Sequence, residues 1–325
     1  MALRAAAALS LSGRFGPLGS QAGAGLDAWA RDRGVRLRIE DDGSDPARSA
    51  RLCAGLAGSA DLLFGPYGSG AGRAVAEAMD GRPEVVWNHG AAAVPRRAAR
   101  LVDVLGPARS YWRGLPAVLG PAPRVAIVRA PGGFGAEVAE GAAAAFAAAG
   151  VAPVADVALD PGDPGAAVRA AAGAGAAWVV GGGRLEDDLA LGRALAGSGI
   201  AAALVACGVA EAGRALGDAV VGWLGPVQWD GTPGPVALPP GCDYPAAQAL
   251  AAGLVAEEAV ARAGSTAPDA LWDAARALRT HTLIGPFAVD DAGRQTAHAP
   301  VIVRWERGPG GPHRVVVPRA DTGEP

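Results

Sequence analysis

Residues Asp61–Gly70 read Asp-Leu-Leu-Phe-Gly-Pro-Tyr-Gly-Ser-Gly, and Val85–Ala93 read Val-Val-Trp-Asn-His-Gly-Ala-Ala-Ala. Each segment is an apolar run that ends in small residues, which is typical of a parallel strand followed by a turn. Both turns then lie at one edge of the sheet, where glycines expose backbone N–H groups and the helix expected near Gly70 adds its positive dipole end. The stretch predicts an edge that receives an anionic or polar group, with a hydroxyl from Ser69. Tight turns that merely connect strand to helix are the alternative.

Length and charge set the first limits on function. The chain has 325 residues, 50% of them hydrophobic, which is enough for roughly two domains with sizeable cores. Its 29 Lys and Arg residues against 32 Asp and Glu residues leave a formal net charge of -3, without a long run of one sign. We therefore expect no nucleic acid and no anionic membrane surface among its partners.

The cysteines and the N-terminus indicate neither a metal site nor an anchor. Cys53, Cys207 and Cys242 match no zinc spacing, and an odd number argues against a full disulfide framework, although one bridge such as Cys207 with Cys242 stays open. Met1–Leu11 is apolar but enters a strand directly, so we expect that no signal sequence is present in this chain. No apolar run is long enough and free enough of Gly and Pro to span a bilayer, so we expect no direct membrane insertion.

Strand and helix patterns alternate in two successive runs, and a helical segment follows them. The expected strands are Leu3–Leu11, Val35–Glu40, two within residues 61–93, Val102–Leu105, Arg124–Arg129, Val154–Ala158, Ala177–Val180, Ala202–Ala206 and Val221–Val227. The expected helices include Ser20–Arg33, Tyr111–Leu119, Ala136–Ala149, Asp163–Ala174, Glu186–Ser198, Tyr244–Ala263 and Pro268–Leu278. Two further strands, Phe287–Val289 and Pro300–Trp305, are expected to flank a hairpin turn at Asp290–Gly293. The sequence thus predicts an α/β fold of two doubly wound units.

Six segments in this order and spacing resemble the type I periplasmic solute-binding proteins, and most of all the leucine/isoleucine/valine-binding family of branched-chain amino acid and amide ABC transporters. The segments are Leu9–Gly16, Asp41–Pro46, Phe64–Gly70, Gly133–Gly135, Asp243–Ala246 and Gly285–Asp290. The resemblance implies two lobes, residues 1–118 with 233–283 and residues 119–232 with 284–325, joined by a three-crossover hinge. It also implies a small-molecule ligand held between closing lobes, an extracytoplasmic location (periplasmic or lipid-anchored), an ABC permease as partner, and no cofactor.

The resemblance carries over to particular residues of the first lobe. Ser69 matches the hydroxyl that holds the ligand carboxylate, after Tyr67 and Gly68, with a helix cap as the alternative. Further matches are Leu18, at a position that is often aromatic, and the next turn with Gly90, Ala91 and Ala92. Ala92 stands where the family has a hydroxyl, and Asn88 or His89 are the polar groups that could replace it.

In the second lobe, Phe134 matches an aromatic residue that covers the ligand, and Gly183 and Arg184 stand where a tyrosine is common. Cys207 falls where an acidic residue would pair with an α-ammonium, and burying that ammonium without a partner is costly. An ordinary α-amino acid is therefore disfavoured unless another carboxylate substitutes. The candidates are Glu186, Asp187 and Glu211.

Two tryptophans are the last candidates, because an aromatic platform suits an apolar or ring-shaped ligand. Trp87 ends a strand beside the same turns and Trp112 lies near a crossover, but core packing explains either one as well. The expected ligand is a small amino-acid-like, amide or carboxylate molecule with an apolar portion, anchored by Ser69 and Arg184.

Catalysis is not expected. Pro66–Gly70 lacks the Gly-x-Ser-x-Gly spacing of a nucleophile elbow, and Gly181–Gly183 does not complete a dinucleotide fingerprint. Two other binding functions stay open, a cytoplasmic ligand sensor with the same two lobes and the outer domain of a membrane receptor.

Overall fold

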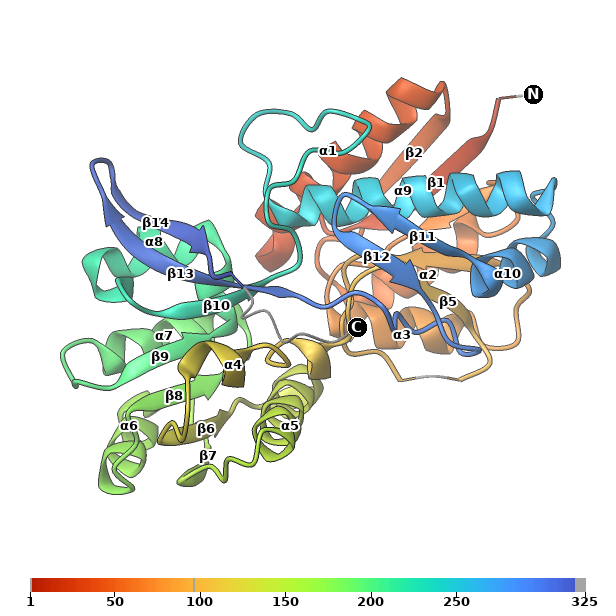
Figure 1. Ribbon diagram of the computed structural model, residues 1–325. Helices are drawn as coiled ribbons and strands as arrows, with labels where there is room; N and C mark the ends of the chain where they lie inside the picture. Colours follow the sequence, from red (N-terminus) through yellow and green to blue (C-terminus); the bar gives the residue numbers. More distant parts are fainter. Residues whose placement is uncertain (1, 96, 319–325) are drawn as a thin grey trace, which may run out of the picture. The chain divides into compact units, whose positions relative to one another are not determined.

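The computed structural model describes residues 2–95 and 97–318, and the chain divides into two compact units. Unit 1 consists of Met1–Pro107 and Gln228–His298, and unit 2 of Ala108–Val227 and Ala299–Pro325. The expected α/β fold with doubly wound parallel sheets is confirmed in both units (Figure 1).

The bounds of the units differ from the lobes expected from the sequence in three segments: 108–118 belongs to unit 2, whereas 228–232 and 284–298 belong to unit 1. The contacts explain the first and the last. The ring of Tyr111 packs edge-on against Phe134 of unit 2 at 5.7 Å. The amide nitrogen of Gln295 donates to the carbonyl of Val104 in unit 1 at 3.1 Å.

Unit 1 is built on a five-stranded parallel sheet in the order β2-β1-β3-β4-β5. Its strands are β1 Arg4–Leu9, β2 Arg36–Asp41, β3 Leu62–Phe64, β4 Val85–Asn88 and β5 Arg100–Asp103. Its helices are α1 Gly16–Arg33, α2 Pro46–Leu56, α3 Ser69–Ala78, α9 Tyr244–Ala263 and α10 Pro268–Ala277. The order reverses between β1 and β3, which is the switch point where open α/β sheets bind ligands at the carboxyl ends of their strands.

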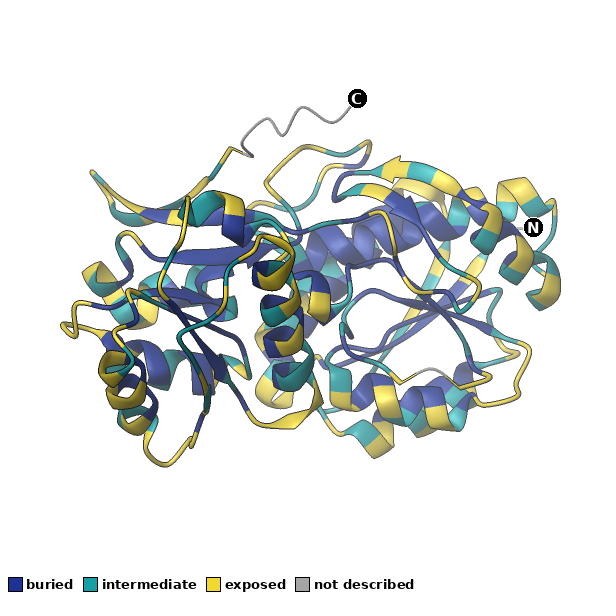
Figure 2. Ribbon diagram, turned by 60° about the horizontal axis from the view of Figure 1, so that its bottom comes forward, coloured by how far each residue is buried: buried dark blue, intermediate teal, exposed yellow. Residues whose placement is uncertain are grey.

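Alternation along β1 divides the core of unit 1 between the two faces of the sheet. Ala5, Ala7 and Leu9 pack in the cluster with α1 and α9, whereas Ala6 packs in the cluster with α2 and α3. Figure 2 shows inner strands in the buried colour, whereas edge strands such as β2 and the outer sides of many helices are partly exposed. Within the first cluster, α9 approaches α1 closely because Gly253 has no side chain, since a Cβ there would lie 2.5 Å from the ring of Trp29. The indole nitrogen of Trp29 donates to Oε2 of Glu257 at 3.4 Å.

Unit 2 is built on a seven-stranded sheet in the order β14-β13-β10-β9-β8-β6-β7, in which β13 and β14 are antiparallel to their neighbours. Its strands are β6 Val125–Arg129, β7 Ala155–Ala158, β8 Trp178–Gly181, β9 Ala201–Leu204, β10 Leu224–Val227, β13 Val301–Gly308 and β14 Gly311–Val316. Its helices are α4 Leu115–Leu119, α5 Gly132–Ala148, α6 Pro164–Gly173, α7 Leu185–Leu195 and α8 Ala210–Leu216. Here the order reverses between β6 and β8, so the turns after these strands form the corresponding edge.

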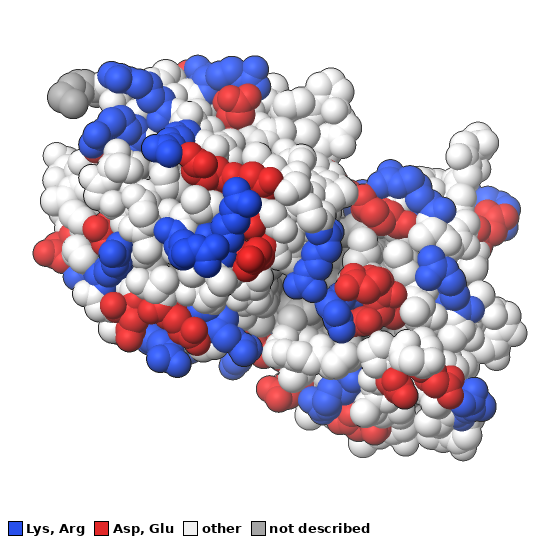
Figure 3. All heavy atoms as spheres, turned by 180° about the vertical axis from the view of Figure 1, so that it is seen from behind, with Lys and Arg blue, Asp and Glu red and all other residues white. Residues whose placement is uncertain are grey.

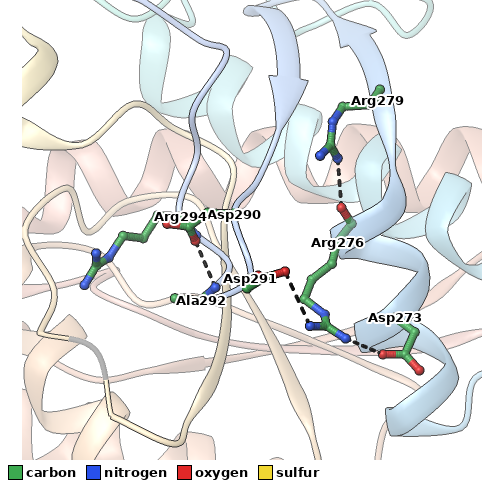
Figure 4. Close-up of polar contacts among 7 residues, drawn as sticks. All are labelled: Asp273, Arg276, Arg279, Asp290, Asp291, Ala292 and Arg294. Carbon is green, nitrogen blue, oxygen red and sulfur yellow. Dashed lines mark hydrogen bonds and ion pairs between the residues drawn. The ribbon is translucent and has the colours of Figure 1, made fainter.

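The hairpin turn expected at Asp290–Gly293 is formed, with Val289 and Gln295 in an antiparallel bridge, but the two strands expected to flank it do not pair with each other. The strand before it, β12 Gly285–Ala288, pairs with β11 Arg279–Thr282, and β13 pairs with β10 and β14 in the other unit. The turn itself is closed by Asp290, whose Oδ1 accepts from the backbone nitrogens of Ala292 and Arg294 at 2.9 Å each (Figure 4). The guanidinium of Arg276 in α10 lies 3.7 Å from the carboxylate of Asp291 in this turn. The same guanidinium lies 2.7 Å from Asp273 on its own helix.

All three cysteines are free, so the possible Cys207–Cys242 bridge is not formed. Among the described residues, no helix combines the length and the apolar character needed to cross a membrane. Figure 3 shows acidic and basic side chains interspersed over one face. Many charged side chains of the described residues form ion pairs, such as Arg129–Asp156 at 2.8 Å.

Candidate functional site

In unit 1, the turns after β3 and β4 form one connected edge. Tyr67 and Gly90 form a parallel bridge, and the nitrogen of Gly68 donates to the carbonyl of Gly90 at 2.8 Å. The Oγ of Ser69, the first residue of α3, accepts from the nitrogen of Ala93 at 3.1 Å. The sequence-predicted residues 67–69 and 90–92 are therefore brought together, and the N-terminus of α3 lies at this edge.

A buried asparagine fixes the second of these turns. The Oδ1 of Asn88 accepts from the nitrogen of Ala91 at 3.0 Å, and its Nδ2 donates to Oδ1 of Asp103 at 2.6 Å and to the carbonyl of Ala91 at 2.8 Å. These bonds commit the amide to the protein, so the expectation that Asn88 replaces the hydroxyl missing at Ala92 is wrong. Ala92 itself is partly exposed, whereas Ala91 is buried.

The turn after β1 completes the switch point of unit 1. The carboxylate of Asp41 accepts from the hydroxyl of Ser12 at 2.6 Å and from the nitrogen of Leu11 at 3.0 Å. The Ser12 hydroxyl bond, helped by bonds from backbone nitrogens, lowers the pKa of Asp41. The nitrogen of Phe15 donates to the Oγ of Ser44 at 3.1 Å, which fixes the aromatic residue at the end of this turn.

Three aromatic side chains gather at this edge. The rings of Phe15 and Tyr67 meet edge to face at 5.7 Å, and the hydroxyls of Tyr67 and Tyr244 lie 3.2 Å apart. Gly68 makes room for this cluster, since its φ is +86° and a Cβ there would lie 2.8 Å from the ring of Phe15. Sequence analysis missed Phe15 and Tyr244 as site residues, although both lie within the segments that carry the family resemblance.

The residues of unit 1 that were expected to contact the ligand differ in how deeply the structure buries them. Trp87 is fully buried in the core of unit 1, so the core-packing alternative describes it. His89 is also fully buried, neither of its ring nitrogens has a hydrogen-bond partner among the described residues, and burial lowers its pKa to about 4. Leu18 lies in the first turns of α1, is partly exposed, and packs against the core. In unit 2, Trp112 is fully buried as well.

In unit 2, the turns after β6, β8 and β9 form the corresponding edge. Phe134 is partly exposed in the first turn of α5 and packs edge to face on Tyr111. Asp188 of α7 joins the other two turns. Its Oδ1 accepts from the nitrogen of Gly183 at 2.7 Å, and its Oδ2 accepts from the nitrogen of Ala206 at 2.9 Å.

The acidic residues proposed to replace the missing ammonium partner already have arginine partners. Asp187 lies 3.0 Å from the Nε of Arg184, and Glu186 lies 3.8 Å from the same guanidinium. Glu211 pairs with Arg214 at 2.6 Å. Arg184 keeps 51% of its side chain exposed, so its guanidinium is both anchored and accessible.

Cys207 does not present its side chain at this edge. The residue is fully buried in the core of unit 2, where burial raises the pKa of its thiol. Its carbonyl accepts from the indole nitrogen of Trp305 at 2.7 Å. The expected ligand contact of the Cys207 side chain is therefore wrong, because the sheet and β13 enclose it.

The chemistry of the two edges suits anion binding. Unit 1 offers a helix N-terminus with a hydroxyl at the edge where the aromatic cluster lies, and unit 2 offers the guanidinium of Arg184 after β8 and the ring of Phe134 after β6. Within residues 2–95 and 97–318, no three His, Cys, Asp or Glu side chains converge to hold a metal ion.

Comparisons with known proteins agree with this architecture. The family model described as periplasmic binding protein matches residues 2–311. A solute-binding protein of an ABC transporter from Rhodopseudomonas palustris BisB5, solved with 3,4-dihydroxybenzoic acid, is 15% identical with a TM-score of 0.77, and the match covers 97% of this chain and 96% of that chain. A solute-binding protein from R. palustris, solved with benzoate, is 20% identical with a TM-score of 0.74, at coverages of 97% and 96%.

A leucine-binding protein from Thermotoga maritima MSB8 is 16% identical with a TM-score of 0.78, and the match covers 97% of this chain and 98% of that chain. No curated protein matches the sequence significantly. The structural likenesses show the fold, and the family match confirms the resemblance that the six sequence segments carry. The chain therefore belongs to the periplasmic binding protein family and has its type I fold.

Proposed function

We propose that this chain is the extracytoplasmic solute-binding protein of an ABC importer and that it binds a small monocarboxylate with an aromatic or apolar body and no ammonium group. In this proposal, the ligand carboxylate lies at Ser69 and the N-terminus of α3, and the turns of both units contact the ligand. A ligand with these contacts stabilises the conformation that provides them, through its differential affinity. Solute-binding proteins of R. palustris solved with benzoate and 3,4-dihydroxybenzoic acid support this ligand class.

One observation argues against an α-amino acid as the ligand. Each carboxylate that could replace the missing ammonium partner is held by an arginine: Asp187 and Glu186 by Arg184, and Glu211 by Arg214. Asp188 is committed to two backbone nitrogens. An ammonium brought to this edge would lose its hydration without gaining an unpaired anion, which costs about 2 kcal/mol or more.

The partly exposed Phe134 and the cluster of Phe15, Tyr67 and Tyr244 support a ring-shaped ligand. Edge-to-face contacts between a ligand ring and these side chains add about 1 kcal/mol each beyond burial. Arg184 offers a second cation toward a carboxylate or phenolic oxygen.

The test is calorimetry with two probes that differ in a single group. 3-Phenylpropanoate and phenylalanine share ring, chain length and carboxylate, but only phenylalanine carries the ammonium. We expect 3-phenylpropanoate to bind about thirtyfold more tightly, the equivalent of about 2 kcal/mol. Tighter binding of phenylalanine or leucine would overturn the proposed ligand class.

Benzoate against benzyl alcohol tests the carboxylate in the same way. We expect benzoate to bind and benzyl alcohol to bind at least about tenfold more weakly, because only the carboxylate accepts charge-assisted bonds at the N-terminus of α3. The importer role is tested by deleting the gene and measuring uptake of the identified ligand at micromolar concentration. Unchanged uptake would favour the sensor function over transport.

A further inference from the structure

Asp188 holds two turns with one buried carboxylate. Only 1% of the residue is exposed, and each carboxylate oxygen accepts from a different turn, Oδ1 from Gly183 after β8 and Oδ2 from Ala206 after β9. Because β8 and β9 are neighbours in the sheet, these bonds set the spacing of adjacent turns at the edge. Both oxygens are needed as acceptors, so the carboxylate must be ionised to make both bonds at full strength.

The same turns are packed tightly enough to move together. A Cβ at Gly182 would lie 2.2 Å from Cγ2 of Val205, in the turn after β9. A Cβ at Gly183 would lie 2.5 Å from the Cβ of Ala130, in the turn after β6 that leads to Phe134. A displacement of the turn after β8 is thus transmitted to the turns on both sides, including the one that presents the aromatic side chain.

We propose that Asp188 is a positioning residue for ligand binding, whose ionised carboxylate holds the turns after β8 and β9 in the arrangement that receives the ligand and whose protonation releases one of them. Arg184, which follows Gly183 directly, is the side chain most affected. The proposal rests on the proposed function, because it assumes that these turns contact the ligand. It makes ligand affinity depend on pH through a residue that need not touch the ligand.

Opposing effects on the carboxylate of Asp188 place its pKa within the physiological pH range. Burial raises the pKa of Asp188 to about 7, against the bonds from Ala206 and Gly183, which favour the charged form. Asp187 and Glu186 on the same helix add to the increase by repulsion. On the neighbouring 3-10 turn Val205–Gly208, the titratable group is the thiol of Cys207, which stays protonated because its own pKa is raised by burial.

The other elements packed against α7 bring charges that are already paired. On α6, Arg169 pairs with Asp163 at 2.8 Å. On α8, Arg214 pairs with Glu211 at 2.6 Å. The strand β9 consists of Ala201–Leu204 and carries no charged side chain. Asp188 therefore has no cationic partner in these elements, and its charge is stabilised by the two backbone donors.

The expected pH dependence follows from the ionised fraction. One pH unit below the pKa, about a tenth of the molecules carry the ionised carboxylate, and apparent affinity scales with that fraction. We expect the dissociation constant for 3-phenylpropanoate to be about tenfold higher at pH 6 than at pH 8. The probe stays ionised over this range, so its own titration does not contribute.

Calorimetry at pH 6, 7 and 8 tests this with Asp188→Asn and a matched control. The asparagine accepts from only one of the two turns at every pH, so its affinity should be about tenfold weaker than that of the unchanged protein at pH 8 and flat between pH 6 and 8. Glu140→Gln removes one negative charge from an exposed position of α5 and should keep the full pH dependence. A flat profile for the unchanged protein, or the same profile for Asp188→Asn, would overturn the proposal.

A second measurement does not depend on any ligand. The amide protons of Gly183 and Ala206, followed by nuclear magnetic resonance from pH 5.5 to 8.5, should titrate with one shared midpoint near 7 in the unchanged protein. The wild-type titration also decides the case in which Asp188→Asn does not fold. If 3-phenylpropanoate and benzoate fail to bind while the two amides titrate together, the proposed ligand class is refuted, but the link between the two turns through Asp188 is supported. If the amides do not titrate, that link is refuted.

Discussion

The Oγ of Ser69 accepts a hydrogen bond from the backbone nitrogen of Ala93 at 3.1 Å, so the first residue of α3 fixes the end of the neighbouring turn. The hydroxyl keeps its own proton as a donor for a ligand carboxylate. The helix-cap alternative is not realised, because no side chain caps α3 and the hydroxyl accepts from the turn after β4. Its contact with a ligand carboxylate stays a prediction.

Replacing Ser69 by alanine should therefore weaken binding and loosen the turn together. We expect benzoate affinity to fall about tenfold and the free energy of unfolding to fall by about 1 kcal/mol, because both the ligand bond and the Ala93 bond are lost. Ser69→Thr should retain most of both. The control is Ser59→Ala, which removes a hydroxyl that donates to the carbonyl of Leu56, before β3 and away from the edge. Unchanged affinity in Ser69→Ala would contradict the assigned anchor.

Gly90 should not tolerate a methyl group. A Cβ there would lie 2.6 Å from Cδ2 of Tyr67 and 3.0 Å from the carbonyl oxygen of Pro66, and the Tyr67 ring is held by Phe15. We expect Gly90→Ala to lower the free energy of unfolding by about 1–3 kcal/mol, measured by urea denaturation. Gly55→Ala is the matched control, because Gly55 lies inside α2 with nothing within 4 Å of its Cβ position, and it should stabilise the protein by about 0.5–1 kcal/mol.

Arg184 should affect stability and affinity through different partners. Arg184→Ala leaves Asp187, only 6% of whose side chain is exposed, without its cation, and should cost about 1 kcal/mol of stability once the exposure of the guanidinium is considered. It should also weaken benzoate binding several-fold. The double variant Arg184→Ala with Asp187→Ala should recover stability in thermal unfolding but not affinity in calorimetry. Recovery of both would remove Arg184 from the ligand site.

His89 should make the protein less stable in mild acid. Burial lowers its pKa to about 4, whereas the unfolded chain takes up a proton near pH 6.5. The contribution of His89 to the free energy of unfolding is thus constant above pH 6.5 and falls as pH decreases toward 4, by about 2 kcal/mol between pH 7 and pH 5. Asp188 acts in the opposite direction, since its raised pKa gives stability that is present at low pH and lost as pH rises through about 7.

The difference between the unchanged protein and His89→Leu isolates the histidine, because Asp188 contributes equally to both. We expect His89→Leu to be the more stable protein at pH 5, by urea denaturation, and the advantage to shrink by about 2 kcal/mol at pH 7. The change also removes two buried ring nitrogens that lack partners. An advantage that is the same at both pH values would show that folding does not change the pKa of His89.

The sequence predicted the alternation of strands and helices because most strands of the parallel sheets are short and apolar and lead into turns that contain glycine. It missed β11, which is polar, and β14, which ends in two exposed valines, since their pairing depends on β12 and β13 and not on a periodic pattern. The turn at Asp290–Gly293 was predicted, but the partners of the strands on either side of it were not, because a turn does not specify which sheet each flanking strand joins.

For the candidate site, the sequence identified the turns better than the side chains. Gly68 and Gly90 are recognisable because only their backbone and small size matter there, and Ser69 because its hydroxyl stands at the start of a helix. The burial of Trp87 is set by residues from α9, distant in the sequence. The amide of Asn88 is committed to Asp103 and to its own turn. The role of Asp188 depends on nitrogens of two different turns, which no local pattern encodes.

The indole of Trp29 meets Glu257 across a separation of 228 positions, and the rest of the interface between α1 and α9 is equally remote. During translation, α1 is synthesised early, and α9 is synthesised only after most of the polypeptide. Until then the apolar side of α1 stays uncovered. The first half of unit 1 is then a nascent segment without its covering helix, exposed to chaperones and to aggregation. Truncation before α9 should accordingly give an insoluble product, because the apolar side of α1 would then stay uncovered.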